Sequence, residues 1–339
     1  MTSNSSAREN MLRFIRGQAN GEVPCIIMVV ATVWDEAPDF YKSLVKEVSG
    51  VCVAVSRNQA LVNESRATDK WGCEWHYPGG HLVGQVEKHP LTDWEKYAEF
   101  KVPSPADYID WEAAARNFCQ QRERGEVATA HIEHGFLYLR MADLRGFENL
   151  MVDLAMGQPE LIDLRDRIVN FWLDMVDRYA SLGVERIDFG DDLGHQNSLP
   201  MRPQMWREIF KPAFKKIYDR CHEHGMAVYM HTDGRIVDIL QDLIEIGVDI
   251  LNPQDLVNGL DNLARLVKGS IAIDLDIDRQ SLTVFGKPEE IDRHVKTCIE
   301  TLGSPKGQLS LIYGAYPGTP KENVAAVARA MQKYRTMWL

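Results

Sequence analysis

The stretch YMHTDGR, residues 229–235, places an imidazole and a carboxylate two positions apart where an apolar run ends. Both side chains are common metal ligands and acid–base groups, so His231 and Asp233 could hold a metal ion or move a proton. Asp233 also precedes Gly234 and a helical pattern, and aspartate is a good N-terminal helix cap. The residues alone leave all three roles open.

A second pair of carboxylates, Asp191 and Asp192, ends the apolar run at 186–192. Adjacent side chains on a strand point to opposite faces, so only one of the two need face a site. A carboxylate near His231 would raise the pKa of the imidazole or complete a metal site. We therefore expect one of these aspartates to act with His231, and the residues do not distinguish between them.

Other polar side chains are candidates for substrate binding. Most of them end further apolar runs, His195 and Gln196 follow Asp192 in a loop, and Arg145 lies in DLRGFENLMVDL (143–154), which resembles the start of a helix. Arg145 could anchor a carboxylate of the substrate or only pair with Glu148. The candidates are Glu133, His134, Arg145, His195, Gln196, Asn252, Gln254, Asp274, Tyr313 and Tyr316.

The elements that must position these side chains are eight short apolar runs, which predict strands buried on both faces, as in a parallel sheet. The runs span 23–30, 51–56, 127–134, 186–192, 227–233, 249–254, 270–276 and 309–315. Between most of them lie stretches with helical spacing, such as 203–225, 234–247 and 319–334, the last opening with Thr319, Pro320 and Glu322 as cap and first turn. This alternation predicts an α/β fold, a distorted (β/α)8 TIM-like barrel. Active sites of such barrels lie at the carboxyl ends of the strands, where these candidates converge.

The domain organisation follows from the absence of low-complexity linkers and repeats, which predicts a single domain over 1–339. Residues 57–126 fit the strand–helix alternation least well, because their stretch TDKWGCEWHYPGGHLVGQVEKHPL is rich in Trp, Gly and Pro. We expect an insertion or lid there. Its aromatic residues, Trp71, Trp75, His76 and Tyr77, could cover a planar substrate or a satellite core.

Composition excludes several classes of function. The 339 residues carry a net charge of −11, which argues against a nucleic-acid partner. No window approaches the roughly 18 apolar residues of a membrane span. The N-terminal MTSNSSAREN lacks the features of a signal peptide, so we expect a cytoplasmic protein. Six cysteines without a C-x-x-C pair indicate reduced, mostly packing thiols.

Three stretches carry a family resemblance: DFGDDLGHQNSLPMRPQMWREIFKPAFKKIYDRCHEHG, HTDGRIVDILQDLIEIGVDILNPQ and GAYPGTPKENVAAV. In order and spacing they resemble the C-terminal two-thirds of the uroporphyrinogen decarboxylase superfamily. That superfamily contains haem-pathway decarboxylases and methyltransferases that work with corrinoid proteins, on one distorted (β/α)8 barrel. The resemblance also implies a homodimer.

The first departure from the family concerns substrate. Haem-pathway decarboxylases carry an N-terminal W-x-M-R-Q-A-G-R-Y signature, whose arginines bind the carboxylates of the tetrapyrrole. The corresponding CIIMVVATVWDEAPDF has no arginine and has Asp35 and Glu36 instead. Carboxylates cannot replace guanidinium groups in binding a polyanion, so this departure argues against a tetrapyrrole substrate.

The second departure concerns the metal. Thiol-using methyltransferases of the superfamily bind zinc through H-x-C and a second cysteine after the last strand. His231 matches the histidine, Asp233 replaces the first cysteine, and Ala315 lies near the second position. Imidazole and carboxylate ligands make a harder, oxygen-favouring site. His231 and Asp233 are the predicted ligands, zinc is the candidate ion, and its retention without sulfur ligands stays open.

The resemblance then favours a methyltransferase that demethylates a small methoxylated, aromatic compound and passes the methyl group to cobalt(I). The cobalamin must be carried by a separate corrinoid protein, because DRHVKT (292–297) lacks the glycine of the D-x-H-x-x-G corrinoid signature. Two alternatives stay open. One is a decarboxylase of a non-porphyrin acid, with Asp191 or Asp192 as the acid and His231 polarising the substrate. The other is a non-catalytic barrel that binds a small molecule.

Overall fold

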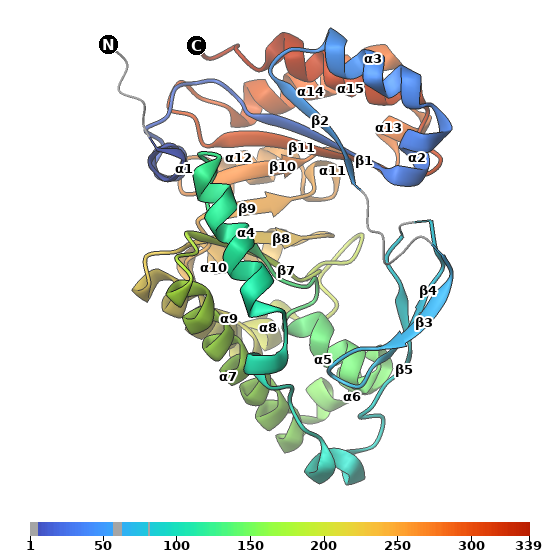
Figure 1. The fold of residues 1–339 in the computed structure, drawn as a ribbon, viewed down its shortest axis with the longest axis vertical. Coiled ribbons are helices and arrows are strands. Elements are labelled where there is room, and N and C mark those ends of the chain that lie inside the picture. Colours follow the sequence, from blue (N-terminus) through green and yellow to red (C-terminus); the bar gives the residue numbers. More distant parts are fainter. Residues whose placement is uncertain (1–5, 57–62, 81) are drawn as a thin grey trace. The chain divides into compact units, whose positions relative to one another are not determined.

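The computed structural model describes residues 6–56, 63–80 and 82–339 (Figure 1). The chain divides into two compact units. The first unit comprises residues 1–11, 66–76 and 84–250, and the second comprises 12–65, 77–83 and 251–339. The prediction of a single domain over 1–339 stays a prediction.

The first unit is built on three parallel strands in the order β6 (Thr129–His131), β7 (Arg186–Gly190) and β8 (Ala227–Thr232). One face of β7 and β8 is apolar and buried, with Ile187, Phe189, Val228 and Met230 each at most 2% exposed. Because side chains alternate along a strand, the opposite face carries the polar residues. The first unit therefore has a closed core on one side of its strands and a polar surface on the other.

Helices cover the apolar face of these strands. The longest, α7, packs beside α9, and α9 contacts β8 (Figure 1). An aromatic cluster joins the two layers, since the Phe136 ring lies 4.9 Å from Phe189 and 5.1 Å from Phe214. The helices of this unit are η2 (Trp94–Glu99), η3 (Pro105–Asp107), α4 (Trp111–Glu123), α5 (Tyr138–Arg145), α6 (Phe147–Met156), α7 (Pro159–Ser181), α8 (Pro203–Ile209), α9 (Lys211–Glu223), η4 (Val237–Ile239) and α10 (Leu240–Glu245).

The region predicted as an insertion or lid contains a small sheet of its own, ordered β3 (Ser65–Thr68), β4 (Glu74–Tyr77) and β5 (Gln85–Lys88). Residues 57–62 and 81 of that region lie outside the described residues. Trp71 is buried, donates a hydrogen bond to the Tyr108 hydroxyl at 2.8 Å and packs edge-on against Phe171. Trp71 therefore belongs to a satellite core, one of the two roles expected for these aromatic residues.

The second unit carries the remaining strands in the order β2 (Val51–Ser56), β1 (Cys25–Val30), β11 (Leu309–Ala315), β10 (Ala272–Asp276) and β9 (Ile250–Pro253). α15 packs against α14 and also contacts β1 and β2. The helices are α2 (Ala31–Glu36), α3 (Pro38–Glu47), α11 (Asp255–Asn258), α12 (Leu260–Leu266), α13 (Leu282–Phe285), α14 (Pro288–Leu302) and α15 (Lys321–Tyr334), while α1 (Ala7–Ile15) crosses the boundary at Met11.

All eight predicted strands are present, and the α/β, TIM-like fold is confirmed. Three helical details differ. The stretch 203–225 forms two helices that meet at Phe210, because Pro212 can occupy only the first turn of a new helix. Arg145 ends α5 and does not lie at the start of a helix. Thr319 does not cap α15, whose N-cap position is held by Pro320.

Within the described ranges, no helix combines the length and the apolar character that crossing a bilayer requires.

Candidate active site

The polar face of β6, β7 and β8 presents a ladder of functional side chains. The register pairs His131 with Asp188, Asp188 with Tyr229, and Gly190 with His231. Side chains two positions apart share a face, so His231 and Tyr229 point to the same side of the strands. Residues that follow β6 and β7 extend this ladder at its carboxyl end.

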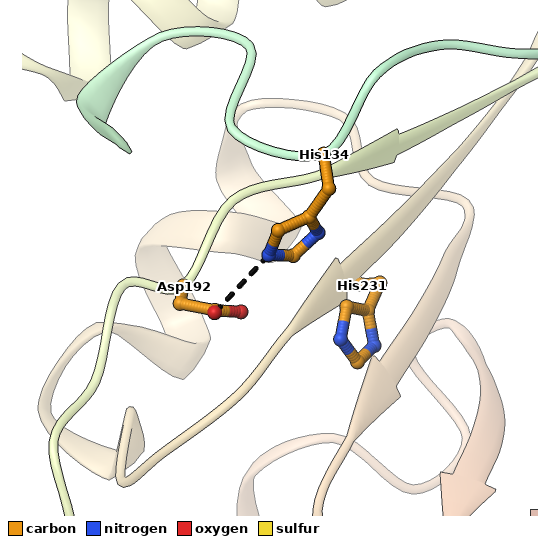
Figure 2. A group of neighbouring side chains, drawn as sticks. All are labelled: His134, Asp192 and His231. Atoms are coloured by element: carbon orange, nitrogen blue, oxygen red, sulfur yellow. Dashed lines mark ion pairs between the residues drawn. The ribbon is translucent and has the colours of Figure 1, made fainter. Parts of the chain in front are cut away.

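A cluster of two histidines and one aspartate lies at that end, and we call it the His134–Asp192–His231 cluster. The His134 Nε2 and Asp192 Oδ2 atoms are 3.1 Å apart. The rings of His134 and His231 lie 5.6 Å apart between centroids. Figure 2 shows His231 on its own strand, beside the His134–Asp192 ion pair. One nitrogen or oxygen atom from each residue lies within 4.8 Å of the other two.

The ion pair sets the charge of this cluster. Burial alone would lower the pKa of His134, but the hydrogen bond and charge of Asp192 outweigh it and raise that pKa. Burial likewise opposes ionisation of Asp192, while His134 and the Asp233 amide lower the pKa of Asp192 overall. The pair therefore favours an imidazolium beside a carboxylate when no metal is bound.

Asp191 has a different role from its neighbour. Its carboxylate is fully buried and accepts hydrogen bonds from the amides of Leu137, Tyr138 and Leu139, at 3.2, 2.6 and 2.8 Å. These amides open α5, whose first donors have no partner within the helix. Burial raises the pKa of Asp191, and the backbone donors act against that shift. Asp192 is thus the aspartate in the cluster, and Asp191 fixes the start of α5.

Asp233 lies beside His231, with 3.5 Å between His231 Nε2 and Asp233 Oδ1. It does not cap the following helix, because η4 begins at Val237 and its N-cap position is held by Ile236. The next residue, Gly234, has φ +81°, and a Cβ there would lie 2.1 Å from the carbonyl oxygen of Gly194. This close approach joins the loops after β7 and β8 and holds Asp192 near His231.

The donor set of the cluster fits a catalytic metal ion. Two imidazoles and one carboxylate are a ligand set found in catalytic zinc sites, which keep one position for water or substrate. The side chains of His134 and Asp192 are partly exposed, at 47% and 32%, so a fourth ligand has access. The sequence predicts His134 as a substrate-binding residue, and it predicts that one of Asp191 and Asp192 acts with His231 as a catalytic residue or completes a metal site. Asp233 stays a predicted ligand.

Glu133 follows β6 but is held by other side chains. Its Oε1 atom accepts a hydrogen bond from the Tyr108 hydroxyl at 2.6 Å and forms an ion pair with Arg140 at 3.0 Å. Arg140 is only 2% exposed and also pairs with Asp69 at 2.9 Å. This partly buried network holds Glu133, the residue just before His134.

Three further candidates of the first unit lie outside the cluster. Arg145 is 3% exposed, pairs with Asp153 at 2.7 Å rather than with Glu148, and stacks on Trp94 at 4.1 Å from the ring centroid. Its guanidinium is engaged within the protein. His195 and Gln196 are exposed in the loop after β7, and the His195 ring lies 5.8 Å from that of Phe147.

The candidates of the second unit form their own set. Asn252 donates to the backbone carbonyl of Asp274, whose carboxylate accepts a hydrogen bond from Ser310 at 2.6 Å. Gln254 is 8% exposed and bridges to Asp276 in the sheet. The structure places Tyr313 in the core, fully buried on the face of β11 that carries Leu311. Tyr316 is 41% exposed, with the Arg279 guanidinium 5.4 Å from its ring centroid.

Sequence reasoning missed the lower part of the ladder. His131 is 69% exposed and contacts Asp188 at 3.1 Å through Nδ1, and Arg186 pairs with Asp188 at 2.7 Å. These side chains lie on the same polar face as His231 but nearer to the start of the strands. The signal in the sequence is the alternation of Arg186, Asp188 and Gly190, which places the three residues on one face of the strand.

A TIM-like α/β fold with such a cluster after its strands defines a class of enzyme scaffold. Comparison with known proteins makes this specific, because residues 68–334 match the family model described as uroporphyrinogen decarboxylase (URO-D). The chain belongs to this enzyme family, which confirms the resemblance seen in the sequence.

Individual relatives are distant. The uroporphyrinogen decarboxylase of Parasynechococcus marenigrum is 26% identical over 182 residues, covering 52% of this chain and 49% of that protein. That of Synechococcus sp. is 34% identical over 131 residues, covering 38% and 36%. The chain thus matches about half, or less, of the length of these relatives. A solved methyltransferase from Methanosarcina mazei superposes with a TM-score of 0.71 at 15% identity, covering 97% of this chain and 99% of that one. At this identity the likeness shows the shared fold.

Proposed function

We propose that this protein is a methyltransferase that demethylates a small methoxylated aromatic compound and passes the methyl group to the cobalt(I) of a separate corrinoid protein. The observation that carries the proposal is the donor set of the His134–Asp192–His231 cluster, which contains two nitrogens and one oxygen. Cysteine, the ligand suited to thiol substrates, is absent from this described group. Imidazole and carboxylate are harder ligands than thiolate, so an ion held by them favours an oxygen atom of the substrate over a sulfur atom.

The chemistry explains why such a cluster is needed. A methyl ether is inert because its alkoxide or phenolate is a poor leaving group. In the proposed step the C–O bond breaks with its electrons on oxygen, and a proton makes that oxygen a hydroxyl. The cobalt(I) electron pair forms the Co–C bond, so cobalt becomes formally cobalt(III). The protein must therefore stabilise negative charge on the departing oxygen.

The residues of the cluster have separate parts in this step. A divalent ion bound by His134, Asp192 and His231 would supply Lewis acidity at the ether oxygen. Without an ion, Asp192 keeps His134 protonated and oriented, and His134 can donate its proton to the departing oxygen. Asp191 and Gly234 hold the two loops in place. The fold shared with a protein named a methyltransferase supports the proposal at the level of scaffold.

The proposal is tested by mixing the protein with cob(I)alamin and a panel of methoxylated aromatics. We expect methylcobalamin absorbance and an equimolar free phenol. Metal analysis before and after chelation separates the two variants: activity lost with the metal and restored by it supports the Lewis acid, and full activity of metal-free protein supports His134 as acid. If no methylcobalamin forms with any compound of the panel, the proposal is contradicted.

A second candidate is decarboxylation of a non-porphyrin acid, favoured by the names of the curated relatives. The same cluster would then polarise a carboxyl-bearing substrate, with Asp192, not the fully buried Asp191, as the aspartate at the site. Carbon dioxide release without any corrinoid is the outcome that would favour this reading over methyl transfer.

A further inference from the structure

The second unit contains another convergence of metal-binding side chains, which the proposed function does not use. Asp255 opens α11, while His294 and Cys298 lie four positions apart on α14 and so share one helix face. His294 is the histidine of DRHVKT, the stretch that fails the corrinoid signature. The three side chains meet in the interior: Asp255 and Cys298 are each 0% exposed.

Their functional atoms surround a single point. The Nε2 atom of His294 lies 2.6 Å from Asp255 Oδ2 and 3.4 Å from Cys298 Sγ. An ion pair between Asp255 and His294 would be complete with those two residues. The Cys298 sulfur beside the same nitrogen atom adds a third electron-pair donor. The other oxygen of Asp255 accepts the Leu256 amide at 2.6 Å, which fixes the direction of the carboxylate.

We propose that Asp255, His294 and Cys298 form a structural site for a divalent transition ion, zinc or cobalt(II) in preference to magnesium or calcium. The mixed sulfur, nitrogen and oxygen ligands have the borderline softness that such ions select. One carboxylate and one thiolate carry two negative charges, so a bound divalent ion leaves the buried site neutral. Binding displaces the thiol proton of Cys298 and any proton held by His294 to solvent.

The geometry requires little movement. Around a tetrahedral zinc ion, nitrogen and sulfur ligands lie about 3.5 Å apart and nitrogen and oxygen ligands about 3.3 Å apart. The observed 3.4 Å between His294 and Cys298 already matches, and the His294–Asp255 distance must widen from 2.6 Å. The His294 side chain is 14% exposed and offers the route by which an ion and a fourth ligand, water, reach the site. None of these residues belongs to the His134–Asp192–His231 cluster.

Cobalt(II) titration of the chelator-treated full chain tests the site. Thiolate-to-cobalt charge-transfer absorbance reports sulfur ligation, which the cluster in the first unit cannot produce. We expect this band in the wild type, its loss in Cys298→Ser, and its retention in Cys221→Ser, a matched change of a buried helical cysteine in the first unit. His294→Gln should weaken cobalt(II) binding by more than about 100-fold, which exceeds the usual effect of losing a residue that only hydrogen-bonds a metal ligand.

Thermal denaturation of each metal-free variant shows whether it is folded before titration. Absence of the band in folded wild type at saturating cobalt overturns the site, and so does a band that survives in Cys298→Ser or disappears in Cys221→Ser. The outcome is independent of methyl transfer, since neither a substrate nor a corrinoid is present.

Discussion

At the scale of residues, the adjacent aspartates Asp191 and Asp192 have different roles. Asp192 pairs with His134, and Asp191 bonds the amides that open α5. The sequence predicts that only one of the pair need face the site, because neighbouring strand side chains point to opposite faces. It could not say which, since that choice depends on where α5 begins in space.

His231→Ala tests the centre of the cluster. We expect kcat for methyl transfer to fall by about 100-fold or more with folding retained, because the change removes a proposed metal ligand beside the acid His134. His224→Ala is the matched control, because His224 pairs with Asp177 at the surface of the same unit. Near-normal turnover of His231→Ala would show that the centre lies elsewhere.

The pH behaviour of His134 follows from its ion pair. Its folded-state pKa is raised by Asp192, so the stabilisation is fully present below the ordinary imidazole pKa, about 6.5, and is lost as pH rises through the raised value. The depressed pKa of Asp192 has the opposite sense: its stabilisation is present above the ordinary carboxyl pKa, about 3.9, and is lost as pH falls through the depressed value.

NMR titration of histidine-labelled, metal-free protein measures this directly. We expect one imidazole signal, absent from His134→Gln, to titrate above the ordinary range, and to move down in Asp192→Asn. An unchanged titration in Asp192→Asn would contradict the ion pair.

At the scale of elements, the loops after β7 and β8 position the chemistry. Asp191→Ala removes the acceptor of three amides, and we expect the free energy of unfolding to fall by about 2–4 kcal/mol. Asp192→Asn breaks a partly exposed ion pair and should cost less than about 1 kcal/mol. Urea denaturation compares the two, and an equal or reversed order would show that Asp191 does not fix α5.

Gly234→Ala tests the contact between the loops. Its φ of +81° and the 2.1 Å approach to Gly194 both oppose a Cβ, so we expect destabilisation of about 3 kcal/mol or more together with loss of turnover. Gly157→Ala is the control, since Gly157 has φ +67° but nothing within 4 Å, and strain alone costs about 1 kcal/mol. Equal effects of the two changes would exclude a role for the loop contact.

The sequence predicts the strands but not the contacts between distant side chains. Strands were predictable because buried parallel strands are continuous apolar runs, and 51–56 and 309–315 coincide with β2 and β11. The role of Arg145 was not predictable, because its partner Asp153 lies on the next helix, α6, and Trp94, on which it stacks, lies about 50 positions earlier in the chain. The pairing of His134 with Asp192 was missed for the same reason: it joins residues 58 positions apart, and no local pattern encodes it.

At the scale of the whole molecule, the chain combines a URO-D family fold with a sequence that differs from two groups of the superfamily. It lacks the N-terminal arginines of the haem-pathway enzymes and the cysteines of the thiol-using methyltransferases. In the proposed function a separate protein carries the cobalt, because the chain has no corrinoid signature. A homodimer and a cytoplasmic location stay predictions.

The most direct test follows the methyl group itself. A methoxylated aromatic labelled with ¹³C in its methoxyl group is incubated with the protein and cob(I)alamin, and the products are followed by ¹³C NMR. The account predicts that the label appears in the cobalt-bound methyl group as the phenol forms, and that His231→Ala blocks both. Label that stays in the ether would contradict methyl transfer. Release of carbon dioxide from a carboxylic acid substrate would then favour the decarboxylase.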